Sequence, residues 1–154
     1  MPESEKKRIL MPILSKQEGN TGFLEQIPKE AEEIFLLLVI DTGFMPGMFG
    51  FAASDIAAGN VLMQLIRKFF VRRRKKCFDI EEWGNTERKI LQTIHLKKIG
   101  TVFLVKQDNQ FYRELVEQIR SESEAEIIEI ELPRKEKETK KEQSDSRGAF
   151  FSRK

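Results

Sequence analysis

The stretch Glu33-Ile-Phe-Leu-Leu-Leu-Val-Ile-Asp41 decides the fold of this chain. Its apolar centre is unbroken and rich in β-branched and aromatic side chains, and polar residues stand at both ends. This composition and length are typical of a β-strand. An unbroken apolar run is typical of a strand that is covered on both faces, as in a parallel sheet. We therefore predict a buried strand over 33–41.

Four other segments have strand character. The runs at 8–14 and 101–106 are almost continuously apolar, whereas those at 78–83 and 126–132 alternate between apolar and polar residues. Pro12 lies inside the first run and donates no backbone hydrogen bond, so it fits a strand only near the strand's end. The last segment has one apolar and one acidic face, which predicts an edge position in the sheet.

Apolar residues recur at helical spacing between these segments. Phe23, Leu24 and Ile27 give the first such pattern, which Pro28 limits. Asparagine and threonine favour the beginning of a helix and glycine its end. Four helices are predicted in this way. The first follows a polar loop at 15–22, and the second runs from Asp55 to Lys76. The third extends from Asn85 or Thr86 to a cap at Gly100, and the fourth follows a polar loop at 106–109.

Strands and helices thus alternate along the chain. This order predicts right-handed βαβ crossovers and a mainly parallel sheet with helices on both faces. We predict a single-domain α/β fold whose five-stranded, doubly wound sheet has the flavodoxin-like order 3-2-1-4-5. Ligands of such sheets bind beyond the carboxyl ends of the strands where the order reverses, here between the loops after Leu14 and Lys106.

The segment Lys7-Arg-Ile-Leu-Met-Pro-Ile13 resembles the opening strand of universal stress proteins, which has a basic residue, an aliphatic run and then proline. The end of the second strand, Val39-Ile-Asp41, is similar to the family's second strand, and the later elements follow at compatible spacing. The resemblance covers residues 6–132 and implies a HUP-like scaffold, a role in stress response and a homodimer. In the family the last strand often forms the dimer, which would place Ile128 and Ile130 at the interface.

The chain departs from the family where ATP-binding members hold the nucleotide. Those members have an aspartate directly after the first strand, where this chain has Leu14. They also have a glycine-rich phosphate loop after the fourth strand, where this chain has Lys106-Gln-Asp-Asn-Gln110 and no glycine between Gly100 and Gly148. Backbone amides cannot wrap a phosphate closely where every residue carries a Cβ. We therefore expect no ATP binding in the family's manner and no cofactor.

The leading hypothesis is a non-enzymatic regulatory or interaction domain. An alternative is a nucleotide or small-ligand binder with an unusual site in the crevice between the first and fourth strands. Polar and charged side chains near the carboxyl ends of the strands would form that site: Ser15, Lys16, Asp41, Lys106, Gln107 and Asp108.

A second alternative is a module that binds anionic surfaces, either lipid or RNA. It would use a basic patch at the end of the long helix, made of Arg67, Lys68, Arg72, Arg73, Arg74, Lys75 and Lys76. The interpretation that we prefer for this patch is a solvated helix end, partly neutralised by Glu81 and Glu82. Lysine and arginine also suit the negative end of the helix dipole.

The loop at 42–54 combines three glycines and a proline with large apolar residues. Exposed apolar patches of this kind mark contacts with partners, so we expect an oligomer interface, a protein partner or a peripheral membrane contact there. A membrane-spanning helix over 34–54 is disfavoured, because Asp41, Pro46 and the glycines would fall inside the span. The patch residues are Phe44, Met45, Met48, Phe49 and Phe51.

Composition excludes several other classes. The net charge is +2, so no whole-protein field favours nucleic acid. The single cysteine, Cys77, excludes an internal disulfide, fits a reducing compartment and is predicted to be structural. The single histidine, His95, cannot make a zinc set and is also predicted to be structural. No catalytic or metal-ligand spacing stands out, so we do not expect an enzyme.

Trp83 is predicted to anchor the third strand against the next helix.

The ends of the chain are polar. Residues 1–5 have no secretory character and are predicted to be flexible, which indicates a cytoplasmic protein. From 133 to 154 the chain is charged and lacks apolar periodicity, which predicts a disordered tail.

Overall fold

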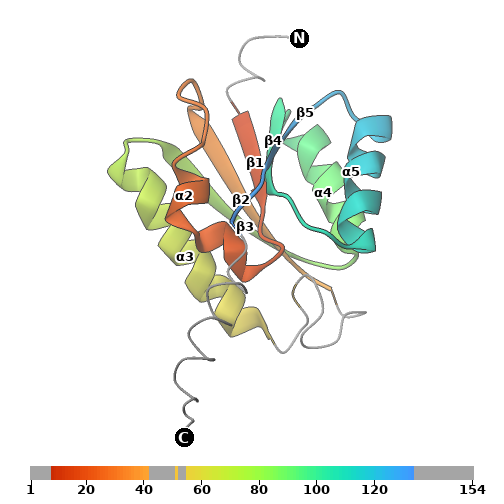
Figure 1. Cartoon of the computed structure of the whole chain (residues 1–154), viewed down its shortest axis with the longest axis horizontal. Helices are drawn as coiled ribbons and strands as arrows, with labels where there is room; N and C mark the ends of the chain where they lie inside the picture. Colours follow the sequence, from red (N-terminus) through yellow and green to blue (C-terminus); the bar gives the residue numbers. More distant parts are fainter. Residues whose placement is uncertain (1–7, 42–50, 52–54, 134–154) are drawn as a thin grey trace, which may run out of the picture.

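The computed structural model describes residues 8–41, 51 and 55–133 (Figure 1). Five parallel strands form one sheet in the order β3-β2-β1-β4-β5, as predicted. The strands are β1 (Arg8–Pro12), β2 (Glu33–Ile40), β3 (Lys76–Trp83), β4 (Thr101–Val105) and β5 (Glu126–Ile130).

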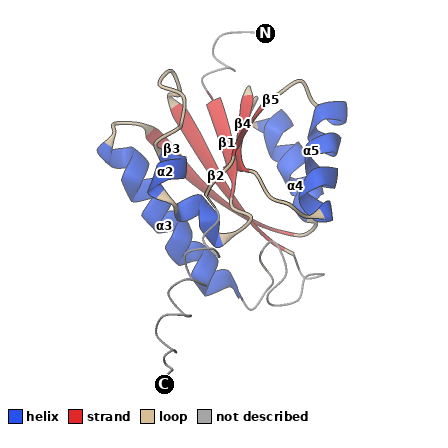
Figure 2. Cartoon of the chain, viewed as in Figure 1, coloured by secondary structure: helices blue, strands red, loops and turns tan. Residues whose placement is uncertain are grey.

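Helices cover both faces of the sheet (Figure 2). On one face lie α2 and α3, and on the other lie α4 and α5, so the predicted doubly wound α/β fold is confirmed. The helical elements are the 3₁₀ turn η1 (Lys16–Gly19), α2 (Thr21–Leu24), α3 (Ile56–Arg72), α4 (Thr86–Leu96) and α5 (Gln110–Glu122).

The strand predicted at 33–41 is β2, and it is buried on both faces. It pairs with β3 along its whole length, from Glu33 opposite Lys76 to Ile40 opposite Trp83. Successive strand residues point to opposite faces, so Leu36 and Leu38 pack in the core under α2 and α3 while Leu37 packs under α4 and α5. We call these the first and the second core cluster.

Several strand ends differ from the prediction by one or two residues. Pro12 is the last residue of β1, which agrees with its predicted place near a strand end. β3 begins at Lys76 rather than at residue 78, because the Lys76 amide donates to the Glu32 carbonyl at 3.1 Å and opens the ladder there. α3 accordingly ends at Arg72, and Arg74, with φ of 64°, makes the turn into β3.

Polar side chains begin the later helices. The Asn85 side chain accepts a hydrogen bond from the Arg88 amide at 2.9 Å, which makes Asn85 rather than Thr86 the cap of α4. Asn109 caps α5 in the same way, with 2.8 Å to the Tyr112 amide. These bonds satisfy amides that have no partner within the helix.

Three local predictions are wrong. Gly100 does not close α4, because Lys98 takes the left-handed conformation (φ 52°) and Gly100 already bonds to the Arg8 carbonyl beside the sheet. The stretch 15–22 is not a simple loop, since η1 and the start of α2 occupy it. Trp83 does not anchor β3, because it lies at the end of an edge strand and is 50% exposed.

Within the described residues, no helix combines the length and the apolar content that a bilayer crossing requires. The predicted flexible N-terminus at 1–5 and residues 134–154 of the predicted tail lie outside the described part of the chain.

Candidate functional site

The crevice predicted between β1 and β4 is formed by the two loops that leave these strands. After β1 the chain keeps pairing with β2, through the Ile13 amide to the Leu37 carbonyl at 2.8 Å, and Leu14 is buried in the second core cluster. After β4 the Lys106 amide donates to the Ile130 carbonyl at 2.8 Å. Leu14 therefore presents an aliphatic side chain to the core and no polar group to the crevice.

The side chain of Gln107 spans this crevice. Its Nε2 donates to Gln17 Oε1 at 2.8 Å and approaches Ser15 Oγ at 3.4 Å. The loop after β4 is thereby linked to the turn after β1. Ser15 and Gln107, two of the residues predicted for this site, thus lie together at this edge of the sheet.

An open groove of about 1070 Å³ continues from the crevice along α5 and β5. Lys106, Gln107 and Asp108 line it together with Gln17, so three of the predicted site residues share one surface. Its charges are mixed, with the basic side chains Lys106, Arg113 and Arg120 opposed by the acidic side chains Asp108, Glu117, Glu129 and Glu131.

Two of the predicted site residues lie elsewhere. Lys16 lines a smaller hollow beside Leu62 and Leu65 of α3. Asp41 is buried at the beginning of α4, where its Oδ2 accepts from the Thr86 amide at 3.2 Å and from Thr86 Oγ1 at 3.3 Å. Asp41 thus helps to hold α4 on the sheet and is not a member of the crevice.

Glu18 is a buried acidic residue that the sequence patterns above do not single out. It is fully buried in η1, and its Oε1 accepts from the Ser15 amide at 2.8 Å and from Ser15 Oγ at 2.9 Å. Its Oε2 has no hydrogen-bond partner among the described residues. Burial raises the pKa of this carboxyl to about 7, although the bonds from Ser15 act in the opposite direction. The pattern Ser15-x-x-Glu18 is a capping box and was the available signal.

Tyr112 lies beside the groove but is itself buried. Its hydroxyl donates to Glu129 Oε2 at 2.7 Å, and Arg120 stands 3.7 Å from the other oxygen of that carboxylate. Burial, then the bond to Glu129, raises the pKa of the phenol. Tyr112 therefore keeps its proton at neutral pH and fastens α5 to β5.

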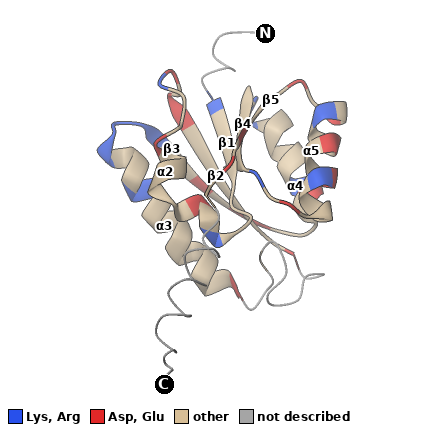
Figure 3. Cartoon of the chain, in the orientation of Figure 1, with Lys and Arg blue, Asp and Glu red and all other residues tan. Residues whose placement is uncertain are grey.

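The predicted basic patch gathers at the end of α3 and in the turn that follows (Figure 3). Lys75 is committed to structure, because its Nζ donates to the carbonyls of Lys29 at 2.9 Å and of Ala31 at 2.6 Å. Arg67 approaches Asp79 at 3.6 Å, and Arg73 lies over the ring of Phe69 at 3.7 Å. The exposed members without such contacts in the described structure are Lys68, Arg72, Arg74 and Lys76.

The predicted apolar patch is described at one residue only. Phe51 is 5% exposed, forms a β-bridge with Ile40 at the end of β2 and packs in the first core cluster. The prediction that Phe51 belongs to an exposed patch is therefore wrong. Phe44, Met45, Met48 and Phe49 lie outside the described residues.

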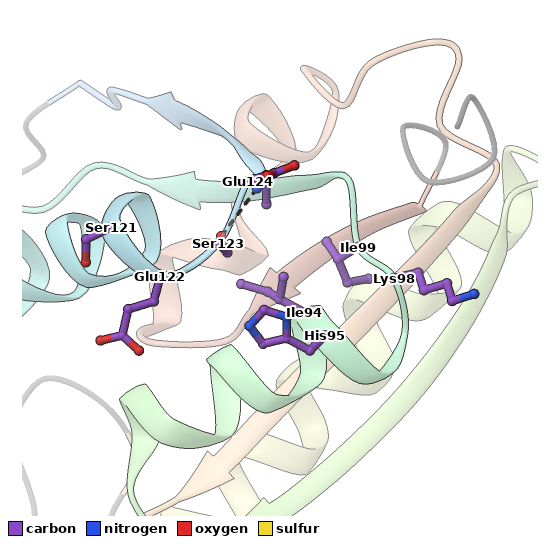
Figure 4. Close-up of a pocket in the computed structure, with 9 residues that line it drawn as sticks. Ile94, His95, Lys98, Ile99, Ser121, Glu122, Ser123 and Glu124 are labelled. Carbon is purple, nitrogen blue, oxygen red and sulfur yellow. Dashed lines mark hydrogen bonds between the residues drawn. The ribbon is translucent and has the colours of Figure 1, made fainter. Parts of the chain in front are cut away.

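Cys77 and His95 carry no reactive arrangement. Cys77 is buried, and this burial raises the pKa of its thiol to about 12. His95 is exposed, so burial gives no support to the structural role predicted for it, and it lines a hollow of about 520 Å³ between the ends of α4 and α5 (Figure 4). No group of three metal-ligating side chains occurs in 8–41, 51 and 55–133.

Sequence comparisons give no match, neither to a family model nor to a curated protein. Solved structures do match. A universal stress protein family protein from Burkholderia pseudomallei aligns with a TM-score of 0.59 and 12% identity, over 86% of this chain and 100% of that one. A universal stress protein family protein from Arabidopsis thaliana with AMP bound aligns with a TM-score of 0.57 and 14% identity, over 84% of this chain and 94% of that one. A hypothetical protein aligns with a TM-score of 0.54 and 16% identity, over 82% of this chain and 96% of that one.

At these identities the likeness concerns the arrangement of the elements. The sheet order, the parallel pairing and the helices on both faces agree with the resemblance that the first two strands predicted. The chain therefore has the fold of the universal stress proteins.

Proposed function

We propose that this chain is a non-enzymatic regulatory or interaction domain that does not hold ATP in the manner of the ATP-binding universal stress proteins that its sequence resembles. The observation that carries the proposal is the Gln107 side chain, which spans the crevice to Gln17 and Ser15. The buried Leu14 supports it, because its side chain offers no polar group to a nucleotide. The glycine-free loop after β4 supports it as well, because backbone amides cannot wrap a phosphate closely where every residue carries a Cβ.

The chemistry of the titratable groups also supports a non-enzymatic role. The pKa values of Cys77 and Tyr112 are raised by burial, so both groups keep their protons at neutral pH. Glu18 has a pKa near neutrality, but its side chain is fully buried beneath η1 and reaches no substrate. General acid–base catalysis requires a group within hydrogen-bond reach of the reacting atoms.

Nucleotides are the ligands to test, because the Arabidopsis relative carries AMP. We expect AMP, ADP and ATP with magnesium to leave the melting temperature of this chain unchanged. A ligand present at a hundred times its Kd would add about 2.7 kcal/mol of stability. For a domain of this size that corresponds to a rise of roughly 5–11 °C, which differential scanning fluorimetry detects easily.

The Arabidopsis protein titrated with AMP is the positive control for this assay. A saturable rise in melting temperature of the present chain would contradict the proposal. If such a rise occurred and were lost in Gln107→Ala, the crevice would be the binding site, and the unusual nucleotide site would replace the interaction domain as the function.

We also propose a homodimer through the outer edge of β5, which is the strand that the family resemblance implicates. The Glu126 amide and the Ile130 carbonyl face β4, so by the alternation of a parallel strand Ile127 and Glu129 turn their backbone groups outward. Ile128 and Ile130 are half-buried and pack against the first core cluster. Lysine at these two positions would therefore disturb folding as well as association.

Proline at residue 127 tests the edge more directly. Ile127→Pro removes the outward amide and leaves the amides that bond to β4 in place, so we expect a dimer to become a folded monomer. Light scattering after size exclusion measures the mass, and circular dichroism confirms the fold. Ile127→Ala is the matched control, because it removes the same side-chain packing against the second core cluster and keeps the outward amide. A monomeric unmodified chain, or a dimer that survives Ile127→Pro, would contradict this interface.

A further inference from the structure

The outward side of α3 carries aliphatic residues where a solvated helix carries polar ones. Val61 is 67% exposed, Leu65 50% and Val71 53%. The buried side of the same helix consists of Gly59, Met63, Ile66 and Phe70. With 3.6 residues per turn, residues 61, 65, 68 and 72 fall on one line opposite this buried side. We call Val61, Leu65, Lys68 and Arg72 the α3 outer stripe.

The α3 outer stripe changes from aliphatic to basic along the helix. Lys68 and Arg72 are exposed, and neither makes an ion pair with another described residue. The sequence has no acidic residue between Asp55 and Asp79, so nothing within α3 offsets these charges. Arg74 adds a further exposed cation in the turn that follows. The α3 outer stripe itself thus combines exposed aliphatic side chains with two cations and no acidic side chain.

The aromatic residues of α3 do not favour single-stranded nucleic acid as the anionic partner. Phe70 is fully buried, and Phe69 packs against the first core cluster beneath the guanidinium of Arg73. Phe70 therefore offers no free face and Arg73 covers one face of Phe69, whereas single-stranded nucleic acids bind by stacking their bases on exposed aromatic rings. The aliphatic groups of the stripe would also meet no apolar surface along a phosphate backbone.

A bilayer interface accommodates both halves of the stripe. Basic side chains attract anionic headgroups, and aliphatic side chains on the same helix enter the boundary between headgroups and acyl chains. α3 lies on the outside of the molecule, on the face of the sheet opposite α4 and α5 (Figure 2). We propose that the α3 outer stripe docks the protein peripherally on bilayers that contain anionic phospholipid. This proposal does not rest on the one above, since it uses neither the crevice nor β5.

Co-sedimentation of the full chain with vesicles tests the proposal. We expect binding to vesicles of equal parts phosphatidylcholine and phosphatidylglycerol, and at least about tenfold weaker binding to phosphatidylcholine alone, because each basic residue near an anionic surface contributes about a factor of five. Binding should fall as salt rises, since screening shortens the reach of the headgroup charge.

Two double variants separate the charge from the apolar contact. Lys68→Glu with Arg72→Glu should reduce binding at least about tenfold, and Val61→Ser with Leu65→Ser should reduce it without changing its salt dependence. The control for the charge variant is Arg88→Glu with Lys97→Glu, and the control for the apolar variant is Leu96→Ser. These controls make substitutions of the same kind at exposed positions on and just after α4. The controls should bind like the unmodified chain.

Three outcomes would overturn the proposal. The first is equal binding to neutral and anionic vesicles, and the second is an equal loss of vesicle binding in the α3 variants and in their α4 controls. The third is binding of the protein to single-stranded RNA without binding to anionic vesicles. The last of these would show that the exposed cations serve a phosphate backbone. Circular dichroism melts of every variant separate lost binding from lost folding.

Discussion

Replacing Glu18 with glutamine is expected to raise the free energy of unfolding at about pH 8 by about 3 kcal/mol, and to change it little near pH 4. Burial raises the pKa of this carboxyl from 4.5 to about 7. Between these values the folded chain holds a proton that the unfolded chain has released. The stability of the unmodified protein therefore falls as pH rises through this window, and glutamine removes the fall because it does not titrate.

Glutamine is also a close match to the protonated acid. Its oxygen can accept the two bonds from Ser15, and its amide group takes the place of Oε2, which has no partner among the described residues. Urea denaturation across the pH range measures the effect. Glu30→Gln, at an exposed residue in the loop before β2, is the control. Its free energy of unfolding should depend on pH as that of the unmodified protein does. Parallel pH profiles for Glu18→Gln and the unmodified chain would contradict the expectation.

Phe103→Ala should lower the free energy of unfolding by about 3–5 kcal/mol, the usual loss for a large ring removed from a core. Phe103 lies in β4 and is fully buried, with its ring stacked on Phe23 of α2 at 4.5 Å. Four-residue α2 has few backbone bonds of its own. Its position on the sheet therefore depends on this stack, and a cavity would open directly beneath the η1–α2 segment.

Phe78→Ala is the control for this substitution. Phe78 also stacks on another ring, that of Phe35 at 5.1 Å, but it is exposed on the edge strand β3. Its removal should cost about 1 kcal/mol, because little cavity forms at the surface. Equilibrium denaturation gives both values. Equal losses for Phe103→Ala and Phe78→Ala would show that the first core cluster does not hold α2 in place.

The sheet could be predicted because its strands carry their own patterns. The unbroken run in β2 and the apolar run in β4 identified buried strands, and the alternation in β5 identified an edge. Trp83 shows where the pattern fails: its apolar side chain favoured burial, but it lies at the end of the edge strand β3 and is half exposed. Exposure at a sheet edge depends on the lengths of distant helices, which local periodicity does not report.

The candidate site was predicted less completely. Ser15 and Gln107 were placed at one crevice because parallel strands end at one edge of a sheet. Asp41 also follows a strand end, but the adjoining start of α4 takes its carboxylate through Thr86. The burial of Glu18 depends on how η1 folds over the sheet. The polar sequence at 15–20 predicts that the Glu18 side chain is exposed to solvent. Only the capping-box spacing of Ser15 and Glu18 indicates that this side chain turns back onto the backbone.

The central position of β1 imposes an order on assembly. Ile9 pairs with Ile34 on one side and with Thr101 on the other, so the first strand to be synthesised has two neighbours that emerge at very different times. β1, β2 and β3 can join once residue 83 has left the ribosome. The other edge of β1 then stays open until β4 appears, and an open strand edge invites pairing with other chains. During synthesis the open edge of β1 is therefore exposed to other chains while residues 84–100 leave the ribosome.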